Sequence, residues 1–421
     1  MSSETRRDFL ISAILITSVL TIAISTFISS PSADLMAVYL AAEQFAAGNF
    51  DQIYSAPAAT FDLSVPDTWR QLAEAQGLGD IQLFPFIYPP LWAAAFGSLT
   101  EMASPTAIFT ASHVINPVLL LGTIFLAWRI LRPSTSLALW LLLGILAIFP
   151  TIYGFIALHQ SQPQIFVSFL IVLAIERSRY NRPVSAGMVM ALAASIKLYP
   201  LLFVAIWVAT GQRRSVKSFF AFGLLLGITS LALGGIDLHF NFLKQISTIN
   251  DTILLTQLTL NFDALLGQFF LSEAFSPNAQ AAPHLTGSTG VNAVKPMAFE
   301  MLSKALLLTS IVVIAWRASK STETAVFRQF WPALLILVSL FGPLSWAYHY
   351  ITAVVFIPSL LLAGPRRLPF WLSVILLIAL SIPGVSYLSS IEMNFYLVQA
   401  IGTIGTALLA LTFLLPLRIR S

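Results

Sequence analysis

Long apolar segments separated by short polar turns are the feature that most constrains the fold of this chain. Its 421 residues are 57% hydrophobic and only 10% charged, whereas a soluble domain is about 25% charged. The apolar residues recur in blocks of about 15 to 25, the length of a helix that crosses a bilayer. Because backbone polar groups inside a membrane must be satisfied internally, these blocks predict one helical bundle. We therefore expect a single all-α polytopic membrane domain over residues 1–421.

The basic residues indicate how the bundle is oriented. They fall in short clusters at the ends of the apolar blocks, and positively charged helix ends face the cytoplasm. By contrast, the stretch from residue 31 to residue 85 holds seven acidic residues and one basic residue, Arg70, which predicts an outer loop. Short basic clusters at helix ends do not form a nucleic-acid-binding surface. The clusters are Arg6/Arg7, Arg129/Arg132, Arg177/Arg179/Arg182, Arg213/Arg214/Lys217, Arg317/Lys320/Arg328, Arg366/Arg367 and Arg418/Arg420.

The order of segments follows from this rule, because an even number of crossings must separate neighbouring basic clusters. About twelve crossings result, with both termini inside. The apolar run 84–99 is short and would break the parity, so we expect it to dip into the outer leaflet without crossing. The first segment is too long for the apolar part of a signal peptide, so we expect it to be retained. The predicted segments are a first transmembrane helix at 9–29, an outer loop with a surface helix at 31–85, core helices at 86–235, a second outer loop at 236–299 and C-terminal helices at 300–417.

Asp34 stands directly after the first predicted crossing. It lies in the first turn of a predicted helix, 33–47, with Ser32 as N-cap and Gly48 as its stop. The apolar stripe of this helix predicts that it lies along the membrane surface. A carboxylate at the outer lip of a helical bundle suits a general base. The alternative is that Asp34 only complements the helix dipole.

Lys197 occupies a second unusual position. Only thirty residues separate Arg182 from Arg213, which is too few for two full crossings at about 1.5 Å per residue. We therefore expect two short helices that turn at 197–200 below the outer surface, in a recess shared with Gln162 and His159. An ammonium in a polar recess could hold a phosphate. The alternative is a lysine that extends to the interface.

Other polar and aromatic residues fall at predicted outer turns. His159, Gln160 and Gln162 resemble a polar lining, and Trp346, Tyr348 and His349 form an aromatic turn; anchoring at the membrane interface is the alternative for the aromatic residues and for Tyr88. The apolar stretch 254–270 could form a second surface helix. The chain has no cysteine, and its five histidines, His113, His159, His239, His284 and His349, show no metal-binding spacing. We therefore expect no metal and no cofactor.

The ordered set of motifs resembles the membrane glycosyltransferases of the GT-C class, and most closely glycosyltransferase family 87, the polyprenyl-phosphate-mannose-dependent type. The matching pieces cover about three-quarters of the chain, and each is short. One departure is Ser161, where the family often has glycine before the glutamine. The pieces are Ser32-Ala33-Asp34-Leu35 with Tyr39 and Gly48-Asn49-Phe50, then 86–91, 161–164, 195–200 and 342–349.

The resemblance implies a GT-C-like bundle that transfers a hexose, with mannose as the type's sugar, from a polyprenyl-phosphate carrier to a lipid or glycan acceptor. It places the reaction at the periplasmic face of a bacterial inner membrane, with inversion and without metal. It implies Asp34 as the base. The charge that develops on a leaving lipid phosphate needs a cation, for which Lys197 is the candidate, with His349 as a helper. The further predicted substrate-binding residues are Tyr88, His159, Gln162, Gln164, Tyr199, Trp346 and Tyr348.

Two other functional classes stay open from the sequence. A transporter or flippase of a lipid-linked saccharide would explain the many helices. The charged outer loop and the lack of an internal repeat speak against it. A structural subunit of an envelope-glycan complex, with Asp34 only as a cap, is the third class.

Overall fold

The computed structural model describes residues 3–30, 32–55, 60–61, 63–271, 276–278, 290–391 and 396–415. His284, Asp62 and the cluster Arg418/Arg420 lie outside these residues. Within them the chain is mostly helical, and six helices are long and apolar enough to cross a membrane. Four shorter apolar helices accompany these six. The fold is therefore the predicted helical bundle, but the expected count of about twelve crossings is not confirmed.

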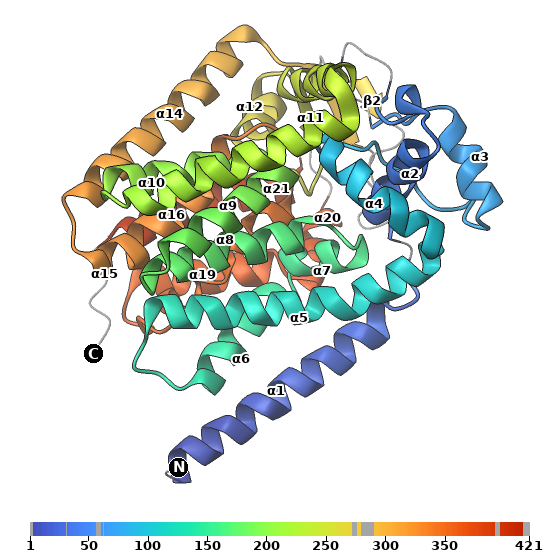
Figure 1. Cartoon of the computed structure of the whole chain (residues 1–421). Coiled ribbons are helices and arrows are strands. Elements are labelled where there is room, and N and C mark those ends of the chain that lie inside the picture. The colour runs from blue at the N-terminus through green and yellow to red at the C-terminus, as the bar shows by residue number, and fades with distance from the viewer. Residues whose placement is uncertain are drawn as a thin grey trace.

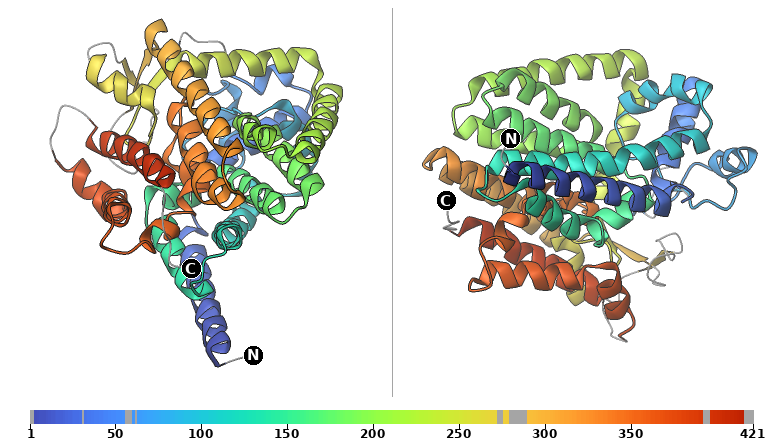
Figure 2. Two further views of the ribbon diagram at one scale, coloured as in Figure 1. Left: turned by 90° about the vertical axis from the view of Figure 1, so that its left-hand side faces the viewer. Right: turned by 90° about the horizontal axis from the view of Figure 1, so that it is seen from below.

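The N-terminal quarter of the chain brings Asp34 into the body of the protein. Helix α1 (Ser3–Phe27) projects from the bundle (Figure 2) and is followed by α2 (Ala33–Ala46), η1 (Phe50–Gln52), α3 (Thr68–Ala75) and α4 (Pro90–Met102). Helix α2 is covered more fully than a surface helix with one apolar stripe would be: ten of its 14 residues are buried. They are buried because α4 packs against α2 (Figure 1). The short run that was expected not to cross forms α4, which at 13 residues is not among the six candidate spans.

The central helices form the core of the bundle. They are α5 (Pro105–Leu131), α6 (Leu137–Ile148), α7 (Ile152–His159), α8 (Gln164–Arg179) and α9 (Pro183–Ile196), followed by η2 (Tyr199–Phe203) and α10 (Val204–Ala209). The two short helices predicted between Arg182 and Arg213 are thus confirmed, with their turn at Lys197. Helix α9 packs closely on the next helix because Gly187 has no side chain: a Cβ there would lie 2.4 Å from the carbonyl oxygen of Ser215.

Helix α11 (Arg213–Asn250) extends well beyond the predicted end of its segment. The second outer loop was expected to begin at residue 236. Instead, the chain bends at Gly235, whose φ of 68° suits glycine, and the helix then continues to Asn250. The side chains of α11 in its apolar window are mostly exposed, as expected of a helix that faces lipid.

The second outer loop is a small sheet with one helix. Strands β1 (Thr252–Leu255), β3 (Gly290–Val294) and β2 (Ser276–Asn278) pair antiparallel in the order β1-β3-β2, and α12 is Phe262–Phe270. The interpretation of 254–270 as one surface helix was therefore wrong in its first part, where the chain is a strand. A short apolar run alone does not distinguish helix from strand, and here pairing with β3 decides.

The C-terminal helices close the bundle. Between Ile351 and Leu361 the helix is interrupted before Pro358 and forms two short pieces, because proline removes a helical donor. The elements are α14 (Met297–Ser319), α15 (Glu323–Ala325), η4 (Val326–Phe330), α16 (Trp331–Phe341), η5 (Ala347–Tyr350), α17 (Ile351–Val354), α18 (Pro358–Leu361), α19 (Leu368–Ala379), α20 (Ile382–Ser389) and α21 (Leu397–Leu414).

Several basic clusters gather at one end of the bundle. Arg129, near the end of α5, lies 2.9 Å from the carboxylate of Glu176 on α8, and Arg179 pairs with Glu323 on α15. Arg328 on η4 donates to the carbonyl oxygen of Leu131, at 3.3 Å. In Figure 1 these helix ends lie on the left, away from α2, α3 and β2 on the right. The basic residues therefore mark one end of the molecule and Asp34 the other.

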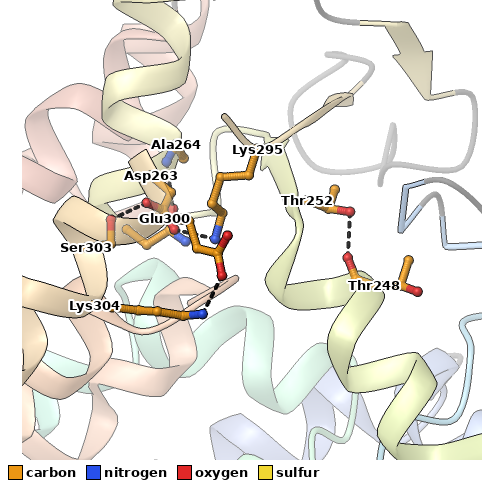
Figure 3. Close-up of polar contacts among 9 residues, drawn as sticks. Thr248, Thr252, Asp263, Ala264, Lys295, Glu300, Ser303 and Lys304 are labelled. Atoms are coloured by element: carbon orange, nitrogen blue, oxygen red, sulfur yellow. Dashed lines mark hydrogen bonds and ion pairs between the residues drawn. The ribbon is translucent and has the colours of Figure 1, made fainter. Parts of the chain in front are cut away.

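A buried ion pair fastens the second outer loop to the bundle. Lys295, directly after β3, lies 2.7 Å from the Asp263 carboxylate on α12, and each side chain is 4% exposed. Ser303 on α14 donates a second hydrogen bond to that carboxylate (Figure 3). Both charges are satisfied only while β3, α12 and α14 stay together.

The substitution Lys295→Met should leave the Asp263 carboxylate buried without a cation. Breaking one partner of a buried ion pair costs about 3–5 kcal/mol, so we expect a clearly lower unfolding temperature in the purified protein. The double variant Asp263→Leu/Lys295→Met should recover most of the lost unfolding temperature, because it removes both charges. Equal stability of wild type and single variant would show that the pair does not hold the loop.

Candidate functional site

The first turn of α2 is tied to the turn between α7 and α8. Ser32 stands at the N-cap position as predicted, but its side chain does not cap the helix. Instead, its hydroxyl donates to the Ser161 hydroxyl at 2.8 Å and lies 3.1 Å from Nε2 of His113 on α5. These contacts fix the start of α2 and thereby where Asp34, two residues further on, can point.

Gln162 connects Asp34 to a tyrosine. Its Nε2 donates to Oδ2 of Asp34 at 2.7 Å, and its Oε1 accepts from the Tyr88 hydroxyl at 3.0 Å and from the backbone N–H of Gln164 at 3.3 Å. The two donors to Oε1 settle which end of the amide faces the carboxylate. Ser161, just before, has a positive φ of 48°, which turns the chain so that Gln162 reaches inward.

Lys197 lies at the turn between α9 and η2, where its own extended backbone ends helix α9. Its Nζ is 3.0 Å from Nε2 of His349 and lies 5.7 Å and 5.5 Å from the ring centres of Tyr88 and Tyr348. An ammonium over aromatic faces is stabilised by the ring electrons. Tyr88 thus contacts both halves of the site, with its ring near Lys197 and its hydroxyl on Gln162.

The hydrogen bonds of His349 define its tautomer. Its Nδ1 accepts from the backbone N–H of Trp346 at 3.1 Å, so the neutral ring carries its proton on Nε2. That N–H faces the Lys197 nitrogen, which can accept it only as a neutral amine. Without substrate, the geometry therefore favours a neutral lysine beside a neutral histidine.

Burial brings the pKa values of Asp34 and Lys197 close to 7. It raises the pKa of Asp34 from 3.8 to about 7, although Lys197 and the Gln162 hydrogen bond act in the opposite direction. It lowers the pKa of Lys197 from 10.5 to about 7, with Asp34 partly compensating. Burial and the neighbouring Lys197 hold the pKa of His349 well below 6.5. A carboxylic acid and an amine that both titrate near pH 7 can exchange protons with substrates.

Asp34 opens into a narrow cavity of about 60 Å³. Its polar lining consists of Asp34, Gln160 and Gln162. The rings of Trp346 and Tyr348 also line it, and they stack with 6.3 Å between their centres and 12° between their planes. Ligand pockets usually measure about 300–1,000 Å³, so this cavity has to widen before it can hold a sugar. Its remaining lining is apolar: Ala37, Phe61, Leu63, Phe84, Pro85, Ile87, Ile156, Leu258 and Leu344, with Tyr88 between the two parts.

The structure brings most of the predicted site residues together. Gln164 and Tyr199 stand behind the others, with Nε2 of Gln164 donating to the Tyr199 hydroxyl at 2.7 Å and the Tyr199 ring 6.1 Å from the ring of His349. His159 lies apart, because its ring meets Phe27 of α1 edge-on, with 6.5 Å between ring centres. The residues that lie together are Asp34, Tyr88, Gln162, Lys197, Trp346, Tyr348 and His349.

Sequence reasoning missed the residues that position or cover the polar ones. Ser161 and His113 hold Ser32, but a lone serine and a lone histidine carry no spacing signal. Phe61, Leu63 and Leu344 cover the cavity as part of a small apolar cluster. Apolar residues in loops cannot be assigned a partner before the loops are placed. Among the described residues, no group of three or more His, Asp or Glu side chains could hold a metal ion.

The substitution Asp34→Asn should stabilise the protein above neutral pH. Because the folded-state pKa of Asp34 is raised above 3.8, the fold favours the protonated acid, and this contribution is lost as the pH rises through about 7. A difference of one in pKa between the folded and unfolded states is worth about 1.4 kcal/mol, while asparagine is neutral throughout and can still accept from Gln162. The gain in unfolding temperature over wild type should therefore grow between pH 4 and pH 8. A gain that does not vary with pH would contradict the raised pKa.

The comparisons with known proteins bear on what such a site does. The search of curated proteins gives no match. The family model of glycosyltransferase family 87 matches residues 86–343, more than half of the chain. This range includes Tyr88, Gln162 and Lys197, whereas Asp34 precedes it and Trp346, Tyr348 and His349 follow it. The chain therefore belongs to glycosyltransferase family 87, and it is a membrane glycosyltransferase.

Proposed function

We propose that the protein transfers a hexose, with mannose as the first sugar to test, from a polyprenyl phosphate to a hydroxyl of a lipid or glycan acceptor. The reaction takes place at the outer, periplasmic face of a bacterial inner membrane and inverts the anomeric carbon. The observation that carries the proposal is the meeting of Asp34 and Lys197. They come from distant segments and share Tyr88, which contacts Lys197 with its ring and reaches Asp34 through Gln162.

Asp34 is the base in this proposal. As the acceptor oxygen forms its bond to the anomeric carbon, its O–H bond breaks and the proton passes to the Asp34 carboxylate. Gln162 holds that carboxylate in place with its N–H group. A base whose pKa is about 7 is matched to operation near neutral pH, where it is partly ionised and still basic.

Lys197 stabilises the leaving group. The bond from the anomeric carbon to the phosphate oxygen breaks with its electron pair on the oxygen, so the phosphate gains one negative charge. A bound phosphate raises the pKa of the neighbouring lysine and favours its ammonium form. The ammonium can then hold the developing charge. His349, whose Nε2–H faces the neutral amine in the absence of substrate, would donate it to the phosphate once Lys197 is an ammonium.

An apolar groove beside Lys197 suits the lipid chain of the donor. It measures about 570 Å³ and runs between α9 and α11, with Phe219, Phe220 and Phe242 among its lining. At one end it is lined by Pro89 and Leu198, the sequence neighbours of Tyr88 and Lys197. An isoprenoid chain in this groove would place its phosphate at the lysine. A donor that enters from the bilayer requires no soluble nucleotide-binding domain.

The distribution of charge supports the outer face as the side of the reaction. The basic helix ends lie away from α2, and positively charged ends face the cytoplasm. The first outer segment, which carries Asp34, holds the acidic residues. Asp34 and its cavity would then open on the opposite, outer side.

Replacing Asp34 by asparagine should abolish transfer, because asparagine cannot accept the acceptor proton. Purified protein in nanodiscs is given radiolabelled polyprenyl-phosphate-mannose and an extract of envelope lipids, and new labelled products are measured. A parallel reaction contains a chelator and should proceed normally. For the wild type, kcat/KM should rise with pH as Asp34 ionises and fall as Lys197 loses its proton, with both limbs near pH 7.

The matched control is Asp80→Asn, an exposed acidic residue of the same outer segment, which should transfer like the wild type. Retained turnover in the folded Asp34→Asn protein would exclude Asp34 as the base. Movement of unmodified donor across the bilayer, without any new product, would instead favour a flippase. A failure with mannose calls for other polyprenyl-phosphate hexoses before transfer itself is rejected.

Replacing Lys197 by methionine keeps the length of the side chain and removes its charge. Without a cation for the leaving phosphate, we expect kcat/KM for the donor to fall by roughly 10²- to 10³-fold. Lys320→Met, at the exposed end of α14, is the control and should not change it. Unchanged donor kinetics would show that Lys197 only extends to the interface.

A further inference from the structure

A second hollow lies on the outer side of the site, between the first outer segment and the last turns of α11. It measures about 440 Å³, within the range of roughly 300–1,000 Å³ that is usual for ligand pockets. Residues of the first outer segment line one side, and the α11 residues Asn241, Lys244, Gln245 and Thr248 line the other. Those of the first segment are Asp51, Gln52, Tyr54, Ser55, Thr60, Phe61, Ser64, Val65, Pro66 and Asp67. We call this hollow the polar cleft. The site and its apolar groove assign no role to it.

The lining of the polar cleft combines donors, acceptors and aromatic rings. Asp51 and Asp67 supply carboxylates, Lys244 an ammonium, and Gln52, Asn241 and Gln245 amides, with Tyr54 and Phe61 as the rings. Gln245 is only 8% exposed as a whole residue, and its side chain lines the cleft. A ligand in the cleft can therefore reach its amide, which both donates and accepts hydrogen bonds.

The balance of charge in the cleft favours a neutral ligand. Two carboxylates face one ammonium, and none of Asp51, Asp67 and Lys244 takes part in an ion pair with another described residue. The carboxylates would repel a phosphate or a sulfate. They accept readily from neutral hydroxyl groups, and amides and the ammonium can donate to the same groups.

Two aromatic residues join the polar cleft to the Asp34 cavity. Phe61 lines both hollows. Tyr54 lines the cleft, and its hydroxyl donates to the carbonyl oxygen of Tyr88 at 2.8 Å. The two hollows are thus separated by the thickness of one side chain.

The position of Phe61 is fixed by the second outer loop. Its backbone N–H donates to the Thr252 hydroxyl at 2.8 Å, and its carbonyl oxygen accepts from the Asn292 side chain at 3.4 Å. The Thr252 hydroxyl donates in turn to the carbonyl oxygen of Thr248 at 2.7 Å (Figure 3). Thr248 belongs to the wall of the cleft, so the partition and the wall are held by one chain of hydrogen bonds.

We propose that the polar cleft binds the acceptor, and that the acceptor presents neutral carbohydrate there. A sugar of the acceptor would occupy the cleft, with a hydroxyl of that sugar or the next passing Phe61 to reach Asp34. This inference rests on the proposed transfer reaction and adds the chemical class of its acceptor. The neutral sugar belongs either to a free glycan or to the head of a glycolipid.

The test uses cleft variants whose side chains are exposed and so do not endanger folding. Asp67→Asn and Lys244→Gln are compared with Asp80→Asn and Lys217→Gln, exposed residues of the same outer segment and of the same helix α11 that do not line the cleft. The amide is tested by Gln245→Leu. All proteins are assayed in nanodiscs at saturating donor, first with free mannobiose or maltose and then with a diglycosyl diacylglycerol.

The cleft variants should raise the KM for the sugar acceptor by roughly tenfold each, the effect of losing one hydrogen bond that involves a charged group. The KM for the donor should stay at its wild-type value, and the controls should change neither constant. Transfer to the free disaccharide would identify a free glycan as the acceptor, and transfer to the diglycosyl diacylglycerol would identify a glycolipid. Wild-type acceptor KM values in all three cleft variants would overturn the assignment, as would transfer to phosphatidylglycerol and not to sugars.

A direct binding measurement separates failure of the cleft from failure of the proposed reaction. Saturation-transfer NMR of mannobiose and maltose with unreacted protein does not require catalysis. Sugar binding that weakens in Gln245→Leu and Asp67→Asn but not in Asp80→Asn supports the cleft even if no transfer is found. Transfer without any sugar binding to wild type, or binding that is equal in all variants, would place the acceptor elsewhere.

Discussion

The partial burial of Asp34 and Lys197 within the bundle is the constraint on which the rest of the site depends. A charged group in a poorly hydrated interior is costly unless it is paired or neutralised. Here the fold supplies the Gln162 amide for the carboxylate and the aromatic faces and His349 for the amine. The desolvation cost that these partners do not offset shifts the pKa values of both groups to about 7. Stability is therefore given up where a base and a phosphate-binding cation can operate.

The surroundings of this pair differ on its two sides, and the difference suits two substrates. The groove between α9 and α11 is apolar, whereas the hollow at Asp51 and Gln245 is polar. In the proposed reaction, a lipid donor and a hydrated acceptor would thus approach the same carboxylate by separate routes. Phe61, held by the small sheet of the second outer loop, stands where the polar route meets the cavity.

Local rules predicted a good part of the fold and of the site. Thirty residues between two basic clusters are too few for two crossings, and the structure confirms two short helices with Lys197 at their turn. Other predictions failed where neighbours decide. The apolar stripe of α2 was expected to face a membrane surface, but α4 packs against α2. Residues 254 and 255 were taken as the start of a helix, but they belong to a strand that pairs with β3. Apolar patterns show that a face is covered and do not show by what.

By itself, the sequence determined that the protein is a helical membrane protein, that its basic ends lie apart from an acidic outer segment, and that Asp34 and Lys197 stand at turns. These properties follow from composition, from segment length and from charge placement, all of which act locally along the chain. Only the tertiary structure decided that Gln162 bridges Asp34 and Tyr88, that His159 turns toward Phe27, and that Phe61 separates two hollows. Such contacts join residues up to 231 positions apart, and their geometry depends on how whole helices pack, which no local pattern records.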